Sequence, residues 1–168
     1  MLVLIAAIFG CQPATPAGEW AADRQGDLVV YAIRHFEKET TPGVSDPELT
    51  ELGRERAQKL AVFLEPVPIQ SVYSTPYHRT MQSVEPVAES KGLEVDTEWQ
   101  GQQDLADHIL ATHGGQHVIA AGHSNTVPDL VAGLGVSPAP VIEEDSYGEL
   151  WVVTVQDGKA TAERTVFD

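Results

Sequence analysis

An apolar segment at residues 28–33 ends directly in Arg34 and His35, and this feature constrains the fold more than any other. An uninterrupted apolar run of this length is typical of a strand buried on both faces of a parallel sheet. Two later predicted strands end in the same way: residues 69–73 precede Ser74-Thr75-Pro76-Tyr77-His78-Arg79, and residues 117–121 precede Gly122-His123-Ser124-Asn125. Because open α/β sheets bind ligands at the carboxyl ends of their strands, we expect these arginines and histidines to form one site.

The segments between these strands have helical patterns. Thr50 precedes a predicted helix with its apolar positions on one face: Leu52, Ala57, Leu60, Ala61 and Leu64. Further helices are predicted from Pro76, in a first turn, to Lys91, and over residues 104–113 and 127–134, with a short strand at 93–95. Residues 149–155 and 161–167 flank an Asp157-Gly158 turn and predict a hairpin. This order favours one α/β domain, a three-layer α/β/α sandwich with a mostly parallel central sheet.

The charge of the chain narrows the possible partners. Ten Lys and Arg residues face 25 Asp and Glu residues, which gives a formal net charge of −15. Such a charge argues against nucleic acid or an anionic lipid surface as the main partner. It also repels phosphorylated molecules on average, so a phosphate site has to be a local cationic pocket. Arg34 and Arg79 are the candidates for that pocket.

The first residues have the character of a processing signal. Residues 2–9 form an apolar stretch too short to span a bilayer, and it stops at Gly10 and Cys11, the single cysteine. The stretch resembles a bacterial lipoprotein signal, although no Lys or Arg precedes it. The resemblance implies a signal peptide at 1–10, lipid on Cys11, a flexible tether at 11–26 and a domain at 27–168, held at the bacterial cell envelope, periplasmic or at the outer surface. The alternative is a buried N-terminal strand with an inert Cys11.

Four segments together carry a family resemblance. They are Arg34-His35, the stretch Leu49-Thr50-Glu51-Leu52-Gly53-Arg54-Glu55-Arg56-Ala57, the stretch from Ser74 to Ser83, and Gly122-His123-Ser124-Asn125-Thr126. In this order and at matching strand ends, they resemble the signatures of the histidine phosphatase superfamily, the phosphoglycerate-mutase-like group. The resemblance covers about residues 28–134. It implies a phosphoglycerate-mutase-like fold and a hydrolase that acts on phosphomonoesters.

The resemblance also implies roles that fit the chemistry of these residue types. Neutral imidazole can attack phosphorus, so His35 is expected to be the nucleophile that becomes a phosphohistidine. Arg34 and Arg79 would clamp the phosphoryl oxygens, and His123, if protonated, would donate another hydrogen bond. Further substrate contacts are expected from Ser124, Asn125, Phe36 and Glu37. Neither a metal nor another cofactor is expected, because positioning and charge provide most of the catalysis.

Two departures from the family pattern affect the expected site. Phe36 stands where most members have glycine, and it would add an aromatic wall to the pocket. The acid that protonates the leaving oxygen in many members has no clear counterpart, and the candidates are Glu98, Asp104 and Glu37. The chain thus resembles the short members without a cap domain, some of which act on phosphoproteins.

Other interpretations of these residues remain open. Arg34 alone could be a sheet-edge residue paired with a carboxylate, and His35 a satisfied core histidine. Four further histidines are expected at the surface or in loops (His78, His108, His113 and His117), with Asp104 and His108 a weak metal pair. Residues 143–145 predict a solvated acidic loop with Tyr147 near the pocket mouth.

Three functions are consistent with the sequence. We expect a monomer that hydrolyses a small phosphorylated substrate, touches a membrane only through lipid on Cys11 and binds no nucleic acid. The alternatives are a phosphoprotein or phosphohistidine phosphatase, and a non-catalytic envelope lipoprotein that binds an anionic ligand.

Overall fold

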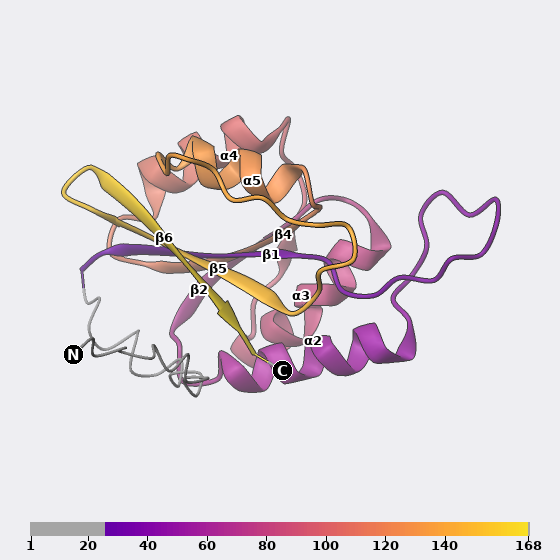
Figure 1. The fold of residues 1–168 in the computed structure, drawn as a ribbon. Coiled ribbons are helices and arrows are strands. Elements are labelled where there is room, and N and C mark those ends of the chain that lie inside the picture. The colour runs from indigo at the N-terminus through magenta and orange to yellow at the C-terminus, as the bar shows by residue number, and fades with distance from the viewer. Residues whose placement is uncertain (1–25, 168) are drawn as a thin grey trace, which may run out of the picture.

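The computed structural model describes residues 26–167 and contains one six-stranded mixed sheet (Figure 1). The strand order is β3-β2-β4-β1-β5-β6. The strands are β1 (Leu28–Arg34), β2 (Ile69–Ser74), β3 (Val95–Asp96), β4 (His117–Gly122), β5 (Glu149–Gln156) and β6 (Lys159–Val166). β1 to β4 run parallel, and β5 and β6 are antiparallel additions beside β1. The expected mostly parallel sheet with an antiparallel ending is confirmed.

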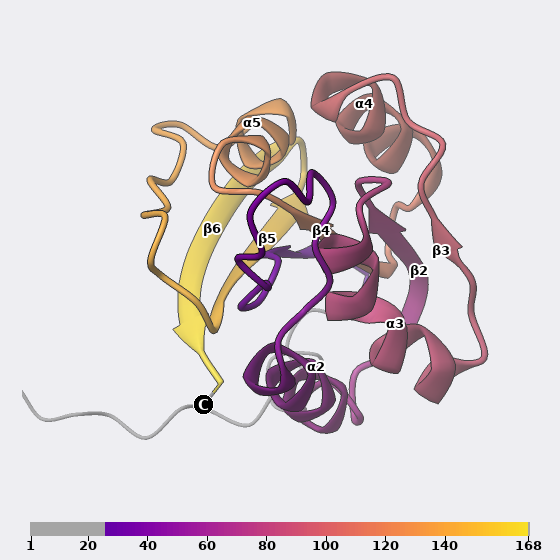
Figure 2. The ribbon, with the colours of Figure 1, turned by 90° about the vertical axis from the view of Figure 1, so that its right-hand side faces the viewer.

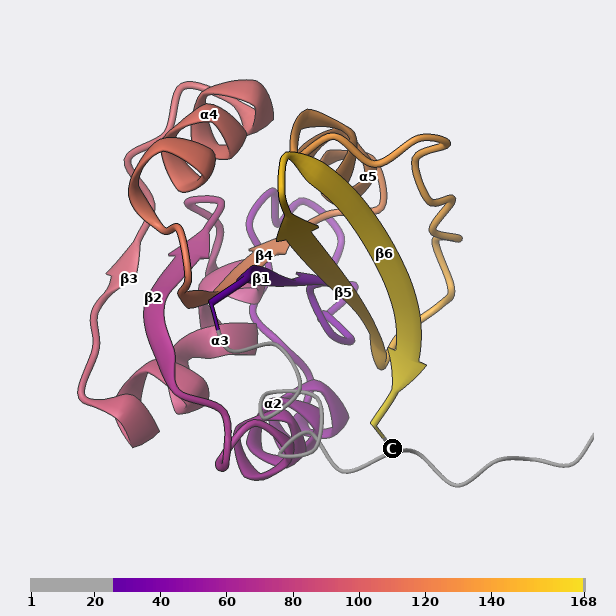
Figure 3. The ribbon, with the colours of Figure 1, turned by 90° about the vertical axis from the view of Figure 1, so that its left-hand side faces the viewer.

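Helices cover both faces of the sheet, as Figures 2 and 3 show from opposite sides. On one face lie α2 (Glu51–Phe63) and α3 (His78–Lys91), and on the other lie α4 (Gln102–Thr112) and α5 (Thr126–Gly133). Side chains alternate along β1, so Val29, Tyr31 and Ile33 pack under α2 and α3, whereas Val30 and Ala32 pack under α4 and α5. The predicted three-layer α/β/α sandwich is therefore confirmed.

The helix that follows Thr50 begins as the sequence predicts. The Thr50 hydroxyl accepts a hydrogen bond from the N–H of Gly53, which satisfies one of the free donors of the first turn. A Cβ atom at Gly53 would collide with the backbone carbonyl of Glu37, so the glycine lets the preceding loop lie directly on α2. The prediction that Leu52 faces the core is wrong, because its side chain is 51% exposed and Gly53 takes the buried position.

The other elements differ from the predictions mainly at their ends. α3 begins at His78, so Pro76 precedes the helix instead of lying in its first turn. Asn125 takes the N-cap position of α5, but no hydrogen bond of its side chain caps the helix. The predicted hairpin is confirmed, with Asp157 and Gly158 at positive φ in the turn between β5 and β6.

Two long loops lie at the edge where the parallel strands end, which faces the viewer in Figure 2. One loop connects β1 to α2, and the other connects α5 to β5. In the first loop, a bridge between Lys38 and Leu49 holds the two arms together. This edge is therefore where side chains from distant parts of the chain meet.

The predicted signal peptide, the tether and the lipid site at Cys11 fall outside the described residues, except that the tether's last residue is Gly26. Within residues 26–167, no helix combines the length and apolar character that crossing a bilayer requires.

Candidate functional site

Three adjacent strands bring the predicted site residues to one edge. β4 lies between β1 and β2, with Arg34 opposite Gly122 and Ser74 opposite Ala121. Beyond the strands, the N–H of His35 donates to the Gly122 carbonyl at 2.9 Å, and the N–H of Thr75 donates to the Ala121 carbonyl at 3.2 Å. The segments that carry Arg34-His35, Thr75 and His123 are thus fixed side by side by backbone hydrogen bonds.

The two histidine rings lie in contact at this edge. The ring centroids of His35 and His123 are 5.4 Å apart, and the rings meet edge to face at 68°. Nδ1 of His35 lies 2.7 Å from the Phe36 carbonyl. A carbonyl can only accept, so Nδ1 carries the proton and Nε2 of the neutral ring keeps its lone pair. The backbone therefore selects the tautomer in which Nε2 can act as a nucleophile.

The surroundings of His35 keep its ring uncharged. Its pKa is lowered from 6.5 to about 4, mainly by burial; the Phe36 carbonyl opposes this shift, and the positive charges of Arg34 and Arg79 add to it. His35 is therefore neutral at pH 7. These electrostatic effects also indicate that both arginines lie close to the His35 ring.

His123 has a similar environment and a different hydrogen-bond partner. Its Nε2 lies 3.0 Å from the Thr75 hydroxyl, which in turn donates to the Thr80 hydroxyl. Burial, Arg79 and Arg34 lower the pKa of His123 to about 4, while Glu144 opposes the shift. The ring is therefore neutral at pH 7 in the ligand-free protein. The cationic form considered from the sequence would require an anion that raises this pKa.

Arg34 is buried at the end of β1 and is held by the loop before β5. Its side chain is 6% exposed. NH1 donates to the carbonyls of Glu143 and Ser146 at 2.9 and 3.2 Å, and NH2 donates to the Glu144 carboxylate at 3.2 Å. The guanidinium also lies 4.6 Å from the centre of the Tyr147 ring. The alternative expectation that Arg34 pairs with a carboxylate is thus met, but on an inner strand of the sheet.

Arg79, in the first turn of α3, is held in a parallel way. Its NH1 lies 3.5 Å from Asp46 in the loop after β1, and its guanidinium is 4.4 Å from the centre of the Tyr77 ring. In both arginines the Nε is buried without a hydrogen-bond partner among residues 26–167. Buried donors are normally satisfied, so two unpaired guanidinium donors beside two histidines are typical of an anion site.

Phe36 does not line this site, and that expectation is wrong. The side chain is fully buried in the core beneath α2 and α3, where its ring meets Phe167 at 5.7 Å. Phe36 lies beyond the end of β1, and its side chain packs with Tyr31 and Ile33 on the α2/α3 side of the sheet. Its contributions at the site are backbone ones: the carbonyl binds His35, and the N–H donates to Ser83.

Of the other residues predicted to contact the substrate or to donate a proton, only Ser124 joins the site. Both carboxylate oxygens of Glu37 accept hydrogen bonds from Arg56 in α2, at 3.0 and 3.2 Å. Glu98 is exposed after β3, and Asp104 is exposed in α4, where it accepts from the Gln100 N–H. None of these three carboxylates has a described contact with the histidine pair. Ser124 joins the site through Glu144, whereas Asn125 is exposed at the start of α5.

Sequence reasoning missed how the loop before β5 joins the site. Residues 143–145 are exposed, as predicted for a solvated acidic loop, yet two backbone carbonyls and the Glu144 carboxylate bind Arg34. Tyr147 lies 6.4 Å from the His35 ring, and Tyr77 lies 5.2 Å from the His123 ring. Of these features, the sequence predicted only that Tyr147 lies near the mouth of the pocket.

Two other histidines are placed differently from their prediction. His113 and His117 were expected at the surface or in loops, but both are buried. Nε2 of His113 lies 2.6 Å from the Tyr73 hydroxyl, and Nδ1 of His117 lies 3.1 Å from the Tyr31 hydroxyl. They are polar residues satisfied by tyrosines within the core. In the described part of the chain, no group of three His, Cys, Asp or Glu residues is arranged to hold a metal ion.

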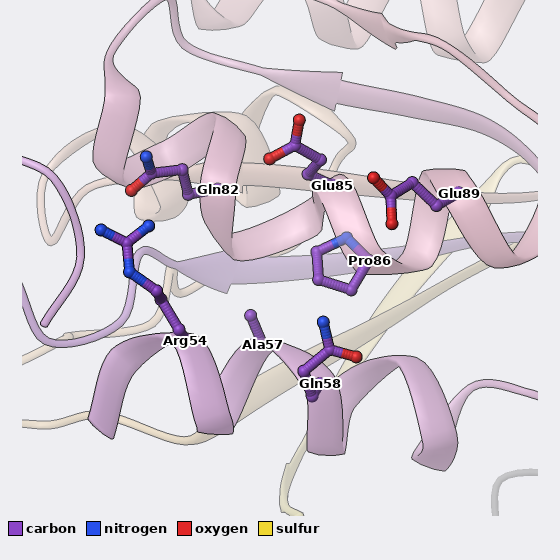
Figure 4. Close-up of a pocket in the computed structure, with 7 residues that line it drawn as sticks. All are labelled: Arg54, Ala57, Gln58, Gln82, Glu85, Pro86 and Glu89. Atoms are coloured by element: carbon purple, nitrogen blue, oxygen red, sulfur yellow. The ribbon is translucent and has the colours of Figure 1, made fainter. Parts of the chain in front are cut away.

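A separate hollow of about 160 Å³ lies between α2 and α3 (Figure 4). Arg54, Gln58, Gln82, Glu85 and Glu89 line it, together with Ala57 and Pro86. None of the predicted site residues is among them, so this hollow is distinct from the histidine pair.

The depressed histidine pKa values predict how stability depends on pH. The unfolded chain binds protons at these rings below pH 6.5, whereas the folded protein does so only near pH 4. Stability should therefore fall as the pH drops from 6.5 to 4, by at most about 3 kcal/mol through His35. Urea unfolding at pH 7 and pH 4.5 tests this, and His35→Asn should show a smaller loss than wild type. An equal loss in both proteins would contradict the assignment.

Comparisons with known proteins agree with this geometry. Residues 30–102 match the family model described as histidine phosphatase superfamily (branch 1). The chain is 38% identical over 68 residues to phosphoserine phosphatase 1 of Hydrogenobacter thermophilus, an alignment that covers 38% of this chain and 32% of that protein. The matched part thus spans about a third of the curated relative.

Solved structures share the fold over most of the chain. The protein histidine phosphatase SixA complexed with tungstate matches with a TM-score of 0.67 and 21% identity, over 82% of this chain and 96% of that one. A mycobacterial glucosyl-3-phosphoglycerate phosphatase complexed with inorganic phosphate matches with a TM-score of 0.61 and 17% identity, over 83% and 96%. The chain thus shares the fold of these phosphatases, and the family match over residues 30–102 together with the motifs at the strand ends supports a place in the histidine phosphatase superfamily.

Proposed function

We propose that this protein is a phosphatase that hydrolyses phosphomonoesters through a phosphohistidine at His35, without a metal ion. The observation that carries the proposal is the state of His35. Its ring is neutral, its Nδ1–H is held by a backbone carbonyl, and its Nε2 lone pair lies in a cluster with His123, the buried Arg34 and the half-buried Arg79. This is the arrangement that nucleophilic attack on phosphorus requires.

The proposed reaction has two steps. In the first, Nε2 of His35 forms a bond to phosphorus while the bond from phosphorus to the leaving oxygen breaks. In the second, water attacks the phosphohistidine, releases inorganic phosphate and returns the neutral ring. The guanidiniums of Arg34 and Arg79 would stabilise the charge on the transferring oxygens in both steps. In the ligand-free protein, the Nε donors of both arginines have no hydrogen-bond partner among the described residues, so they are free to donate to phosphoryl oxygens.

A phosphoryl group would replace carboxylates that now contact the arginines. Glu144 contacts Arg34, and Asp46 contacts Arg79. A dianion bound between the guanidiniums would also raise the pKa of His123, so that its ring becomes a cationic donor. Attachment to a membrane through lipid on Cys11 is a separate proposal that rests on the sequence alone.

The decisive assay is hydrolysis of p-nitrophenyl phosphate by the full chain between pH 5 and 8 in excess EDTA. We expect turnover that is unchanged by the chelator, since His35 needs no metal to attack phosphorus. Binding of phosphate or vanadate without any turnover would instead favour a non-catalytic protein that binds an anionic ligand. Activity that disappears in EDTA and returns with a divalent cation would overturn the proposed chemistry.

A further inference from the structure

The loop that precedes β5 brings a carboxylate to the histidine pair. Arg34 anchors this loop through the carbonyls of Glu143 and Ser146, and Tyr147 packs on the guanidinium. Figure 2 shows the loop running from α5 to β5 beside the edge where β1 and β4 end. The side chain of Glu144 is thereby placed at the same edge as the proposed nucleophile.

Both carboxylate oxygens of Glu144 bind groups expected to contact phosphate. One oxygen accepts a hydrogen bond from NH2 of Arg34 at 3.2 Å, and the other accepts from the hydroxyl of Ser124. Arg34 is nine-tenths buried and its Nε has no partner among the described residues, so an anion is still called for at this guanidinium. Glu144 therefore lies beside two groups that are expected to hold a phosphoryl group.

The other nearby carboxylates are held elsewhere. Asp46 is fixed by the backbone and ring of His78 as well as by Arg79. Glu37 is bound through both oxygens by Arg56. Glu144, in contrast, is 83% exposed, so its side chain can rotate once a phosphate takes over Arg34 and Ser124.

We propose that Glu144 protonates the leaving oxygen and then removes a proton from the attacking water, an assignment that rests on the proposed phosphatase function. In the first step, the carboxylic acid of Glu144 donates its proton to the oxygen that departs from phosphorus, so the alcohol leaves neutral and Glu144 becomes a carboxylate. In the second step, this carboxylate takes a proton from water as the water oxygen bonds to the phosphohistidine. Glu144 and His35 then both return to their starting states.

The contacts of Glu144 explain how its charge would change during this cycle. In the ligand-free protein, the hydrogen bond from the Ser124 hydroxyl lowers the pKa of Glu144 most, and the positive charges of Arg34 and Lys38 lower it further. A phosphate that binds Ser124 and Arg34 removes two of these contacts and adds negative charge beside the carboxylate. Both changes raise the pKa, so substrate binding favours the protonated form that the first step needs.

The test compares esters whose leaving groups need a proton to different degrees. Nitrophenolate leaves without protonation, whereas the alkoxide of glycerol 2-phosphate does not. We expect Glu144→Gln to lower kcat/KM for glycerol 2-phosphate by about 10²-fold or more and that for p-nitrophenyl phosphate by less than about tenfold. Because kcat/KM covers steps up to departure of the leaving group, a slow second step does not obscure the comparison.

Two matched variants complete the experiment. Asp145→Asn removes an exposed carboxylate from the same loop and should leave both substrates within a few-fold of wild type. Asp46→Asn examines the other carboxylate near an arginine. A loss specific to the alkyl ester in Asp46→Asn but not in Glu144→Gln would overturn the assignment.

The other outcomes are also decisive. An equal loss on both esters in Glu144→Gln would show that Glu144 only positions the loop. Tighter phosphate binding with no ester-specific loss would show that Glu144 only competes with the substrate, and it would overturn the proposal too. A wild-type protein that is inactive on p-nitrophenyl phosphate would instead contradict the proposed function itself.

Discussion

Replacement of His35 by alanine should reduce kcat for p-nitrophenyl phosphate by at least about 10⁴-fold, as loss of a nucleophile does in other covalent mechanisms. The reason is geometric, because the neighbouring imidazole cannot replace His35 as the nucleophile. Among the described residues, His123 is the one imidazole that contacts the His35 ring, and its Nε2 is already hydrogen-bonded to the Thr75 hydroxyl. His123 therefore cannot take over the attack with that nitrogen.

A second variant separates chemistry from folding. His35→Asn keeps a side-chain N–H that can donate to the Phe36 carbonyl, but it has no ring nitrogen to attack phosphorus. We expect it to be as inactive as the alanine variant, to unfold cooperatively in urea and still to bind vanadate. More than about one per cent of wild-type activity in either folded variant would contradict a nucleophilic role.

Loss of Arg79 should have the next largest effect. Arg79→Ala removes a guanidinium whose buried Nε has no partner among the described residues, and we expect kcat/KM to fall by about 10²- to 10³-fold, the usual loss for one donor to a developing oxyanion. Arg79→Lys keeps the charge without the planar fork, so it should recover only part of that loss. Initial rates with p-nitrophenyl phosphate measure both variants.

Arg164 provides the matched control for this prediction. It lies on β6, is 55% exposed and pairs with Glu149, so Arg164→Ala removes the same charge away from the site. We expect its kcat/KM to stay within a few-fold of wild type, because exposed ion pairs contribute little. If Arg79→Ala behaves like Arg164→Ala, the guanidinium of Arg79 does not bind the transferring group.

The meeting of the four cationic or potentially cationic residues was predictable from the sequence. Each of the three segments follows a predicted strand, and the carboxyl ends of parallel strands share one edge. The structure places β1, β4 and β2 side by side, so residues that follow them become neighbours. This argument needs only the strand pattern, which the apolar runs make plain.

Other features of the site have no such pattern. The loop at residues 143–147 binds Arg34 largely through the carbonyls of Glu143 and Ser146, and backbone carbonyls are present in every loop. Whether a given loop reaches a given guanidinium depends on the path of the chain in three dimensions. The Glu144 contact therefore appears only in the structure.

The position of Phe36 is of a different kind, because Phe36 lies beyond the end of β1 and its side chain shares the α2/α3 face with Ile33, which simple alternation along the strand does not predict. The buried positions of His113 and His117 depended on tyrosines in distant strands, Tyr73 and Tyr31, that satisfy their ring nitrogens. A single sequence gives no sign of such pairs. Polar residues in a core are therefore the ones that sequence patterns place least well.

The central claim is that a phosphoryl group is carried on His35, and rapid trapping of the intermediate tests it most directly. Wild-type protein is mixed with ³²P-labelled phosphoester, quenched in alkali within milliseconds and digested for mass spectrometry. We predict a label that is stable in alkali and lost in acid, as expected of phosphohistidine, on the peptide that contains His35 and absent from His35→Asn. Label on His123 or another residue, or turnover in His35→Asn without any labelled intermediate, would contradict the account.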